Sequence, residues 1–138
     1  MRTIILSVKP EFAKKILNKD KTIELRKLIG KFFMPGNTIF IYESSPSKKM
    51  VASCIIEKIE TIDVGSISNE QLKKASVERV FYDTYFAKKN IAHLIHLSKV
   101  KPMKNPLSLE FMRQYEFTPP QSFCYASNEF LKLLEGEK

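Results

Sequence analysis

The segment KTIELR, residues 21–26, sets three charged side chains into an apolar alternation. In a strand, Glu24 and Arg26 point to one face and the neighbouring Ile and Leu point to the other. Lys21 has the parity of the apolar face, so it joins the pair only if it lies in the entry turn. A carboxylate beside two cations can bind a phosphate or a base edge, or help to move a proton. The charged face is therefore either a solvated surface or a site.

Two further segments carry polar groups suited to ligand binding. Tyr42 and Ser44 share one strand parity in IYESS, and Gln121 and Ser122 follow a diproline that stiffens their backbone. Such groups can hydrogen-bond a base edge, and a tyrosine ring can stack on one. The competing interpretations are a core aromatic for Tyr42 and an exposed Glu24–Arg26 ion pair, worth at most about 1 kcal/mol. If that pair is exposed, its removal should leave thermal unfolding almost unchanged.

The cysteines and histidines do not suggest a metal site. Cys54 and Cys124 lie far apart among apolar and aromatic residues, so we expect reduced thiols. His93 and His96 are three residues apart, which places them on opposite faces of a strand. No CxxC or HxxxH spacing is present. We expect no metal and no cofactor.

Composition is typical of one globular domain over residues 1–138, with 43% hydrophobic and 28% charged residues. The net charge of +8 makes this a basic protein, and its lysines cluster. Residues 9–31 hold eight basic and three acidic side chains, and residues 88–104 hold five lysines and no acid, so each stretch is +5. Clustered basicity is typical of nucleic-acid binding and equally of a solubilising surface.

No apolar run approaches the roughly 20 residues that cross a bilayer. The apolar stretch near residue 1 is also too short for a signal peptide. We therefore expect a cytoplasmic protein with no membrane partner.

Periodicity places the candidate residues on short elements. It predicts strands over 3–8, 21–27, 38–44 after a turn at 35–37, 48–64 as one bent strand, and 91–101. Helices are predicted over 9–20, with Pro10 at the first position, 68–76, with a capping box, and 76–89, starting at Ser76. Residues 102–115 suggest a loop and a short helix. The tail, residues 116–138, suggests an aromatic stretch followed by an amphipathic helix. This pattern indicates an α+β chain, either a small mixed barrel or an open sheet.

Four ordered blocks, ILSVKPEFAKKIL, KTIELR, IYESSP and PPQSFCY, resemble the ASCH domain family of the PUA-like superfamily. The hallmark of that family is G-x-K-x-x-E-x-R, which places Lys21, Glu24 and Arg26 at its functional positions. Lys19 replaces the glycine, which raises the question of the turn geometry there. The resemblance implies a small PUA-like mixed β-barrel decorated by short helices, with a pocket where this trio meets Tyr42, Ser44, Gln121 and Ser122.

The resemblance implies a nucleic-acid-binding module for RNA or a modified nucleoside. One alternative is a metal-free hydrolase of the ribonuclease or amidohydrolase type, with catalytic residues unknown. The threonine-type amidohydrolase is disfavoured because Glu24 occupies the nucleophile position, and Thr22 would have to act from a different register. Another alternative is a regulatory domain whose basic surface binds a protein partner.

Overall fold

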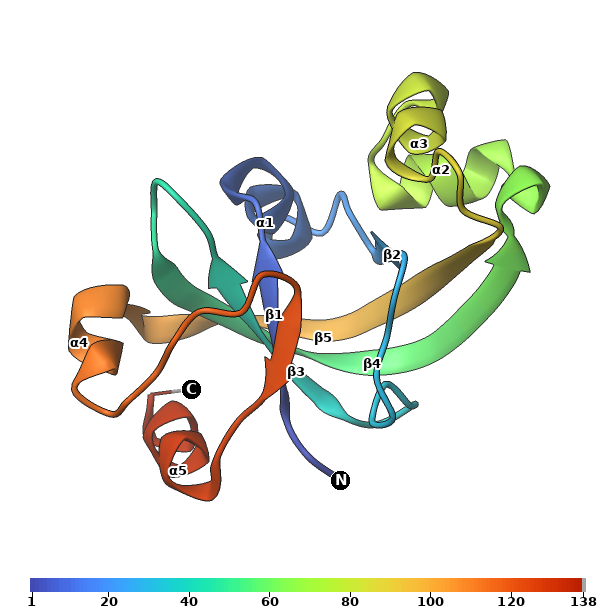
Figure 1. Ribbon diagram of the computed structural model, residues 1–138. Coiled ribbons are helices and arrows are strands. Elements are labelled where there is room, and N and C mark those ends of the chain that lie inside the picture. The colour runs from blue at the N-terminus through green and yellow to red at the C-terminus, as the bar shows by residue number, and fades with distance from the viewer. Residues whose placement is uncertain (138) are drawn as a thin grey trace.

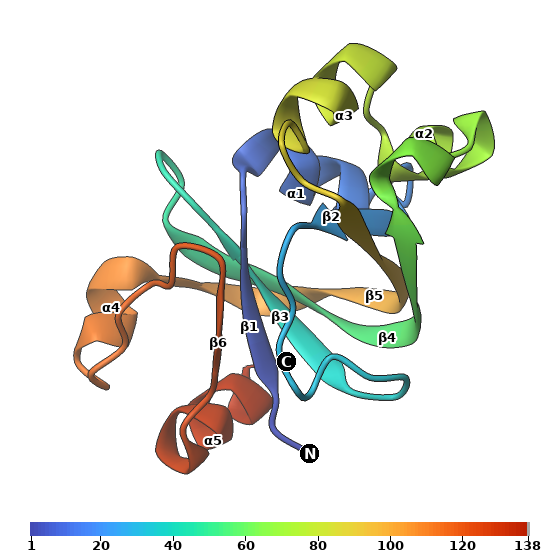
Figure 2. The ribbon, with the colours of Figure 1, turned by 45° about the vertical axis from the view of Figure 1, so that its right-hand side comes forward.

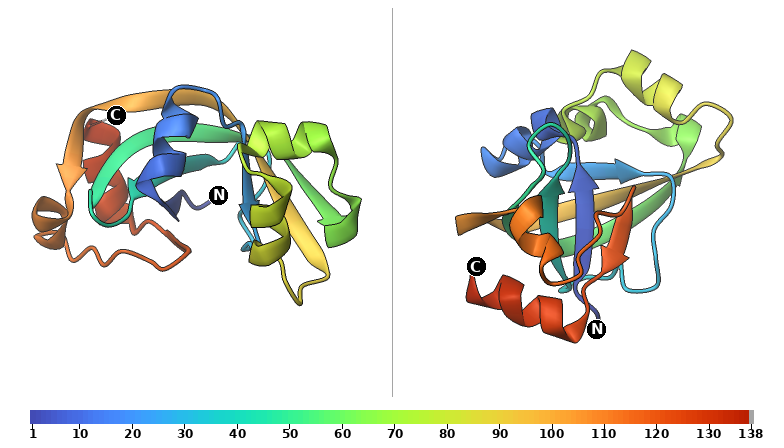
Figure 3. Two further views of the ribbon diagram at one scale, coloured as in Figure 1. Left: turned by 90° about the horizontal axis from the view of Figure 1, so that it is seen from above. Right: turned by 60° about the vertical axis from the view of Figure 1, so that its left-hand side comes forward.

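The computed structural model describes residues 1–137, which form one curved sheet of six strands with short helices around it (Figure 1). The strand order is β2-β5-β4-β3-β1-β6. The strands are β1 (Ile4–Val8), β2 (Ile23–Arg26), β3 (Thr38–Glu43), β4 (Lys49–Asp63), β5 (Ile91–Ser108) and β6 (Phe123–Tyr125). Strands β1 and β3 are parallel, and every other neighbouring pair is antiparallel. The long β4 and β5 arch together over the rest of the chain (Figure 3).

The helices confirm most of the predicted positions. They are α1 (Pro10–Leu17), α2 (Asn69–Ala75), α3 (Arg79–Tyr85), α4 (Leu109–Arg113) and α5 (Asn128–Gly136), with a 3₁₀ turn at Val64–Ser66. The capping box is present, since Ser68 Oγ accepts from Gln71 N at 3.0 Å and Gln71 Oε1 accepts from Ser68 N at 2.8 Å. Within residues 1–137, no helix is long and apolar enough to cross a membrane.

Three details differ from the sequence prediction. Ser76 does not start α3: it ends α2 in the left-handed region at φ 56°, and Glu78 precedes α3. Residues 102–108 continue β5 instead of forming a loop, although they include Pro102. The proline is tolerated because β2 pairs only with His93–His96 of β5, so this part of the strand has β4 on one side alone. The aromatic stretch of the tail is the short strand β6, paired with β1.

Apolar side chains on both faces of the curved sheet form three buried clusters. Figure 2 shows α1, α2 and α3 gathered over one part of the sheet, with α4 and α5 on the opposite side. Alternation along β1 places Ile4 and Leu6 in the cluster under α1, and Ile5 in the cluster under α4 and α5. The third cluster packs α2 and α3 on β2 and β5. Each helix is thus fixed by its own apolar stripe.

Both cysteines are free, as predicted; Cys54 is buried and Cys124 is half-buried. Burial, together with the nearby Glu24 charge, raises the pKa of the Cys54 thiol to about 12. The thiol therefore stays protonated and acts as a small apolar side chain of the core.

Strands β2 and β6 lie at the two ends of the strand order and do not pair with each other. We call the gap between β2 on one side and β1 with β6 on the other the seam. Next to the seam, the loop after β2 packs on β6, where Tyr125 Oη accepts a hydrogen bond from Phe32 N at 3.2 Å. A Cβ on Gly30 would lie 2.2 Å from Tyr125 Oη, so any other residue here would push the Tyr125 side chain out of its present position. Side chains therefore close the sheet into a half-barrel where backbone pairing ends.

The turn between α1 and β2 answers the question raised by Lys19. Lys19 adopts the left-handed region at φ 69°, a conformation that glycine takes without strain. Asn18 Oδ1 accepts from Asp20 N at 2.9 Å, and Lys21 N donates to Lys15 O at 3.0 Å. The turn expected of a glycine is thus retained by a lysine held in a strained conformation.

We predict that Lys19→Gly stabilises the protein by about 0.5–1 kcal/mol, because relief of the left-handed strain exceeds the added entropy of the unfolded chain. Urea unfolding followed by circular dichroism measures this difference. Lys14→Gly, in the middle of α1, is the matched control and should destabilise by about 1 kcal/mol. A loss of stability in Lys19→Gly would show that the lysine side chain itself stabilises the turn.

Candidate functional site

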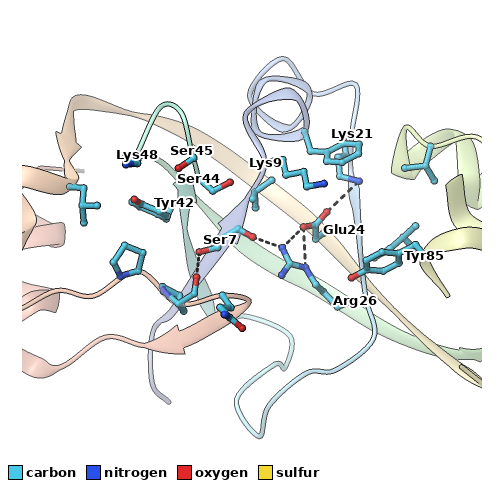
Figure 4. Close-up of a pocket in the computed structure, with 18 of the residues that line it drawn as sticks. Ser7, Lys9, Lys21, Glu24, Arg26, Tyr42, Ser44, Ser45, Lys48 and Tyr85 are labelled. Atoms are coloured by element: carbon cyan, nitrogen blue, oxygen red, sulfur yellow. Dashed lines mark hydrogen bonds and ion pairs between the residues drawn. The ribbon is translucent and has the colours of Figure 1, made fainter. Parts of the chain in front are cut away.

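A cavity of about 510 Å³ opens at the seam. Its walls come from the end of β1, the start of α1, β2, the turn after β3, the α2–α3 segment, α4 and the diproline loop before β6 (Figure 4). Figure 4 shows Tyr42, Ser44, Ser45 and Lys48 at one end of the cavity, and Lys21, Glu24, Arg26 and Tyr85 at the other. The site is thus built from segments distant in sequence.

The structure brings the seven predicted site residues together. Six of them line the cavity: Lys21, Glu24, Arg26, Tyr42, Ser44 and Gln121. The seventh, Ser122, is not a lining residue; its Oγ accepts from Arg26 Nη1 at 3.2 Å. The sequence blocks therefore converge on one place in space.

The three charged residues of the KTIELR segment form a buried unit, which we call the ionic brace (Lys21, Glu24 and Arg26). Glu24 Oε2 accepts from Arg26 Nη2 at 2.6 Å and from Nε at 3.2 Å, and Glu24 Oε1 lies 3.3 Å from Lys21 Nζ. Lys21 precedes β2, as the parity argument required, and its ammonium also donates to Ala75 O at 2.5 Å. Both oxygens of the carboxylate are thus occupied within the protein.

Arg26 extends the brace across the seam. Its Nη2 donates to Ser7 O of β1 at 2.7 Å, and its Nη1 donates to Ser122 O at 3.4 Å as well as to Ser122 Oγ. Every nitrogen of the guanidinium therefore has an acceptor inside the protein. Side-chain exposure is only 2% for Lys21, 8% for Glu24 and 11% for Arg26. The competing interpretation of an exposed ion pair does not hold, because the half-barrel closes over these residues.

Burial and mutual charge set the ionisation of the brace. Burial by itself would raise the pKa of Glu24, but the Arg26 and Lys21 charges outweigh it and the pKa is lowered. Burial lowers the pKa of Lys21, and the Glu24 charge only partly offsets it. Because Glu24 ionises more readily folded than unfolded, its contribution to stability is present above its ordinary pKa of 4.5 and is lost as the pH falls through the lowered value.

Tyr42 lines the cavity, but almost all of its side chain is buried. The residue is 2% exposed, and its ring packs against Phe117 with centroids 5.7 Å apart. The predicted stacking of Tyr42 on a base is therefore excluded by core packing. Burial raises the pKa of its hydroxyl, against the opposing charge of Arg113, so the group stays protonated and can donate a hydrogen bond.

Several lining residues were missed by sequence reasoning. The exposed cations Lys9, Lys48 and Arg113 reach the cavity from three different segments, and none of them makes an ion pair within residues 1–137. The aromatic rings of Phe81 and Tyr85 reach it from α3. The clustering of charge in the sequence indicated a basic surface in general. Which cations line the cavity depends on how distant segments come together in the fold.

The described part of the chain holds no cluster of three or more His, Cys, Asp or Glu side chains that could bind a metal ion. His96 Nε2 lies 2.5 Å from Glu60 Oε1, and His93 Nδ1 lies 2.9 Å from Thr61 Oγ1, so the two histidines have separate partners.

Comparisons with known proteins agree with this arrangement. The model of the ASCH domain matches residues 6–101. An ASCH domain-containing ribonuclease from Zymomonas mobilis is 28% identical over 127 residues, which cover 91% of this chain and 84% of that protein. The large ribosomal subunit protein uL22 of Ureaplasma parvum serovar 3 is 28% identical over 131 residues, which cover 89% of this chain but 39% of that protein.

Solved structures show the same fold. The crystal structure of ASCH from Zymomonas mobilis has a TM-score of 0.90 and 27% identity, and the match covers 98% of this chain and 94% of that one. Human THYN1 protein, solved in complex with 5-methylcytosine containing DNA, has a TM-score of 0.62 at 16% identity, covering 100% and 98% of the two chains. The predicted PUA-like α+β fold is confirmed. With its family model matched over more than half its length, the chain belongs to the ASCH domain family.

Proposed function

We propose that this ASCH domain binds RNA, or a modified nucleoside within RNA, in the cavity at the seam. The observation that carries the proposal is the combination of groups on its walls. Cations that make no ion pair within residues 1–137, serine hydroxyls and aromatic rings line a single volume of about 510 Å³. That volume is within the usual range of ligand sites, roughly 300–1,000 Å³. Phosphate, ribose and base each find a chemically matched surface there.

The ionic brace shapes this cavity and is not its phosphate site. All nitrogens of Arg26 and both oxygens of Glu24 are engaged, and Lys21 is 2% exposed. A phosphate could reach these groups only by displacing their present partners. Lys9, Lys48 and Arg113 make no ion pair in the described part of the chain and are the better candidates for phosphate binding.

Metal-independent RNA cleavage is the second candidate function. It is favoured by the relative from Zymomonas mobilis, which is called a ribonuclease and matches 91% of this chain. Attack of a ribose 2′-oxygen on the adjacent phosphorus, with loss of the 5′-oxygen, gives a 2′,3′-cyclic phosphate and a free 5′-hydroxyl. The proton of the 2′-hydroxyl passes to water as the new P–O bond forms. The protonated Tyr42 hydroxyl, at the same end of the cavity as Lys48 (Figure 4), can donate its proton to that leaving oxygen and regain one from water. Arg113 also lines the cavity.

The other alternative, a protein partner, can be tested in the same binding experiments, because an acidic protein would compete with RNA for the exposed lysines.

The free thiols of Cys54 and Cys124 support a reducing compartment, and we propose that the protein acts in the cytoplasm.

We predict that Glu24→Gln lowers the free energy of unfolding by about 3–5 kcal/mol, because it leaves the buried ammonium of Lys21 without its counter-charge. Chemical unfolding at pH 7 measures the effect. Glu70→Gln is the matched control, since its ion pair with Lys74 is exposed and should contribute little. Equal stabilities of the two variants would mean that the brace is not needed for folding.

We predict that total tRNA is retained by the protein and that binding weakens log-linearly with salt, as phosphate contacts require. Mass spectrometry of the retained fraction, in parallel with a mixture of modified nucleosides, identifies the species bound. Binding that does not respond to salt would indicate a pocket for a free nucleoside. Retention of neither RNA nor nucleosides would overturn the proposed function.

We predict that any cleavage persists in EDTA, gives 2′,3′-cyclic phosphate ends and falls about 100-fold or more in Tyr42→Phe, on the usual scale for loss of a general acid. RNA affinity should change little, because the ring and its packing remain. End-group analysis by mass spectrometry reads the product. Cleavage that is unchanged in Tyr42→Phe would remove this residue from the reaction.

A further inference from the structure

We infer that the cavity holds an RNA chain with a base against the aromatic side chains of α3 and its phosphate between Lys48 and Arg113. The next nucleotide then lies in an adjoining hollow beside α4. This inference rests on the proposed function and narrows it, because it makes the ligand an oligonucleotide rather than a free nucleoside.

The aromatic end of the cavity is suited to a base. Phe81 is 41% exposed, and its ring lies nearly parallel to that of Tyr85, with centroids 6.1 Å apart and an interplanar angle of 10°. Phe12 supports Phe81 edge-on at 5.7 Å. The neighbouring ionic brace offers no unused donor from Arg26. Lys27 Nζ already lies 4.3 Å from the centroid of the Tyr85 ring, so the exposed ring of Phe81 is the surface that this end offers to a base. Bases stack on such surfaces with little regard to sequence.

The opposite end of the cavity is suited to a phosphate. Leu109 N donates to Lys48 O at 2.9 Å, which ties the turn after β3 to the start of α4. Arg113 lies four residues further along α4, one turn from Leu109, and so belongs to the same wall as Lys48. The hydroxyl groups of Ser44 and Ser45 line this end too. Two exposed cations with no ion pair in residues 1–137 thus meet beside hydroxyl donors.

A second hollow, of about 260 Å³, continues from this end. It shares Lys48, Leu109 and Arg113 with the main cavity and extends to Pro46, Ser47 and Glu110. The two cations therefore stand between two hollows. A phosphate held there has room for a nucleoside on each side, which is the arrangement of a phosphodiester within a chain and not of a single nucleoside.

The test uses fluorescently labelled single-stranded hexaribonucleotides, and titrations from 50 to about 300 mM salt followed by anisotropy. Lys48→Gln and Arg113→Gln should each reduce the slope of log affinity against log salt by about 0.7, the value for one phosphate contact on a single strand. Phe81→Ala should weaken binding about tenfold or more through lost stacking, with the slope unchanged. Unlabelled ribonucleosides should compete far more weakly than unlabelled hexamers.

Matched controls come from neighbouring residues outside both hollows. Lys49→Gln removes the same net charge as Lys48→Gln, and Val80→Ala truncates a side chain of α3 that is 76% exposed. Both should bind like the wild type. Two outcomes would overturn the inference but not the proposed function. In the first, the wild type binds RNA, and Lys48→Gln and Arg113→Gln leave its salt slope unchanged. In the second, nucleosides compete as well as hexamers do. Failure of the wild type to bind any RNA overturns the proposed function, and the inference with it.

Discussion

The ionic brace is the constraint on which the arrangement of the molecule depends. Strand β2 pairs with β5 and strand β6 pairs with β1, and among residues 1–137 no backbone ladder joins the two ends of the sheet. Arg26 supplies bonds there, from one guanidinium to β1, to the loop before β6 and to Glu24. The planar fork of arginine meets all these acceptors at once, which the single ammonium of a lysine cannot do. Burying the charges is costly, and only full pairing makes that cost tolerable.

The cavity is a direct result of this way of closing the sheet. A fully paired small barrel fills its interior with side chains, whereas a seam bridged by one arginine leaves space beside the bridge. The wall formed by the brace is rigid because each charged atom has a partner. Lys48 and Arg113 on the opposite wall are exposed, and neither makes an ion pair with any residue from 1 to 137. One side of the site is therefore fixed in shape, and the other is free to adjust to a ligand.

Local sequence patterns predicted the elements and the seven residues that meet at the site. Alternation identified β1 to β4, Pro10 and the Ser68–Gln71 box identified helix starts, and the resemblance singled out Lys21, Glu24 and Arg26. Burial of the trio could not be predicted in the same way, because the partners of Arg26 at Ser122 are 96 residues away. For the same reason, the sequence did not identify Arg113 and Phe81 as cavity residues, because they reach the cavity only through packing between distant segments. Pro102 was also misleading, because a proline is expected to end a strand that has neighbours on both sides. The sequence does not show that β2 ends before it reaches this part of β5, which leaves Pro102 with β4 on one side alone.

The pairing of β1 with β6 has a consequence for when the site comes into being. Ser7 lies near the start of the chain and Ser122 near its other end, yet Arg26 requires both, and Ser7 N also donates to Ser122 O at 2.9 Å. Contacts between such distant segments form late and slow the folding of a domain. During synthesis, the first hundred residues can build the central strands while the cavity still lacks its diproline wall. A nascent chain therefore lacks the completed surface until its diproline segment, Pro119 and Pro120, has been synthesised and has folded against β1.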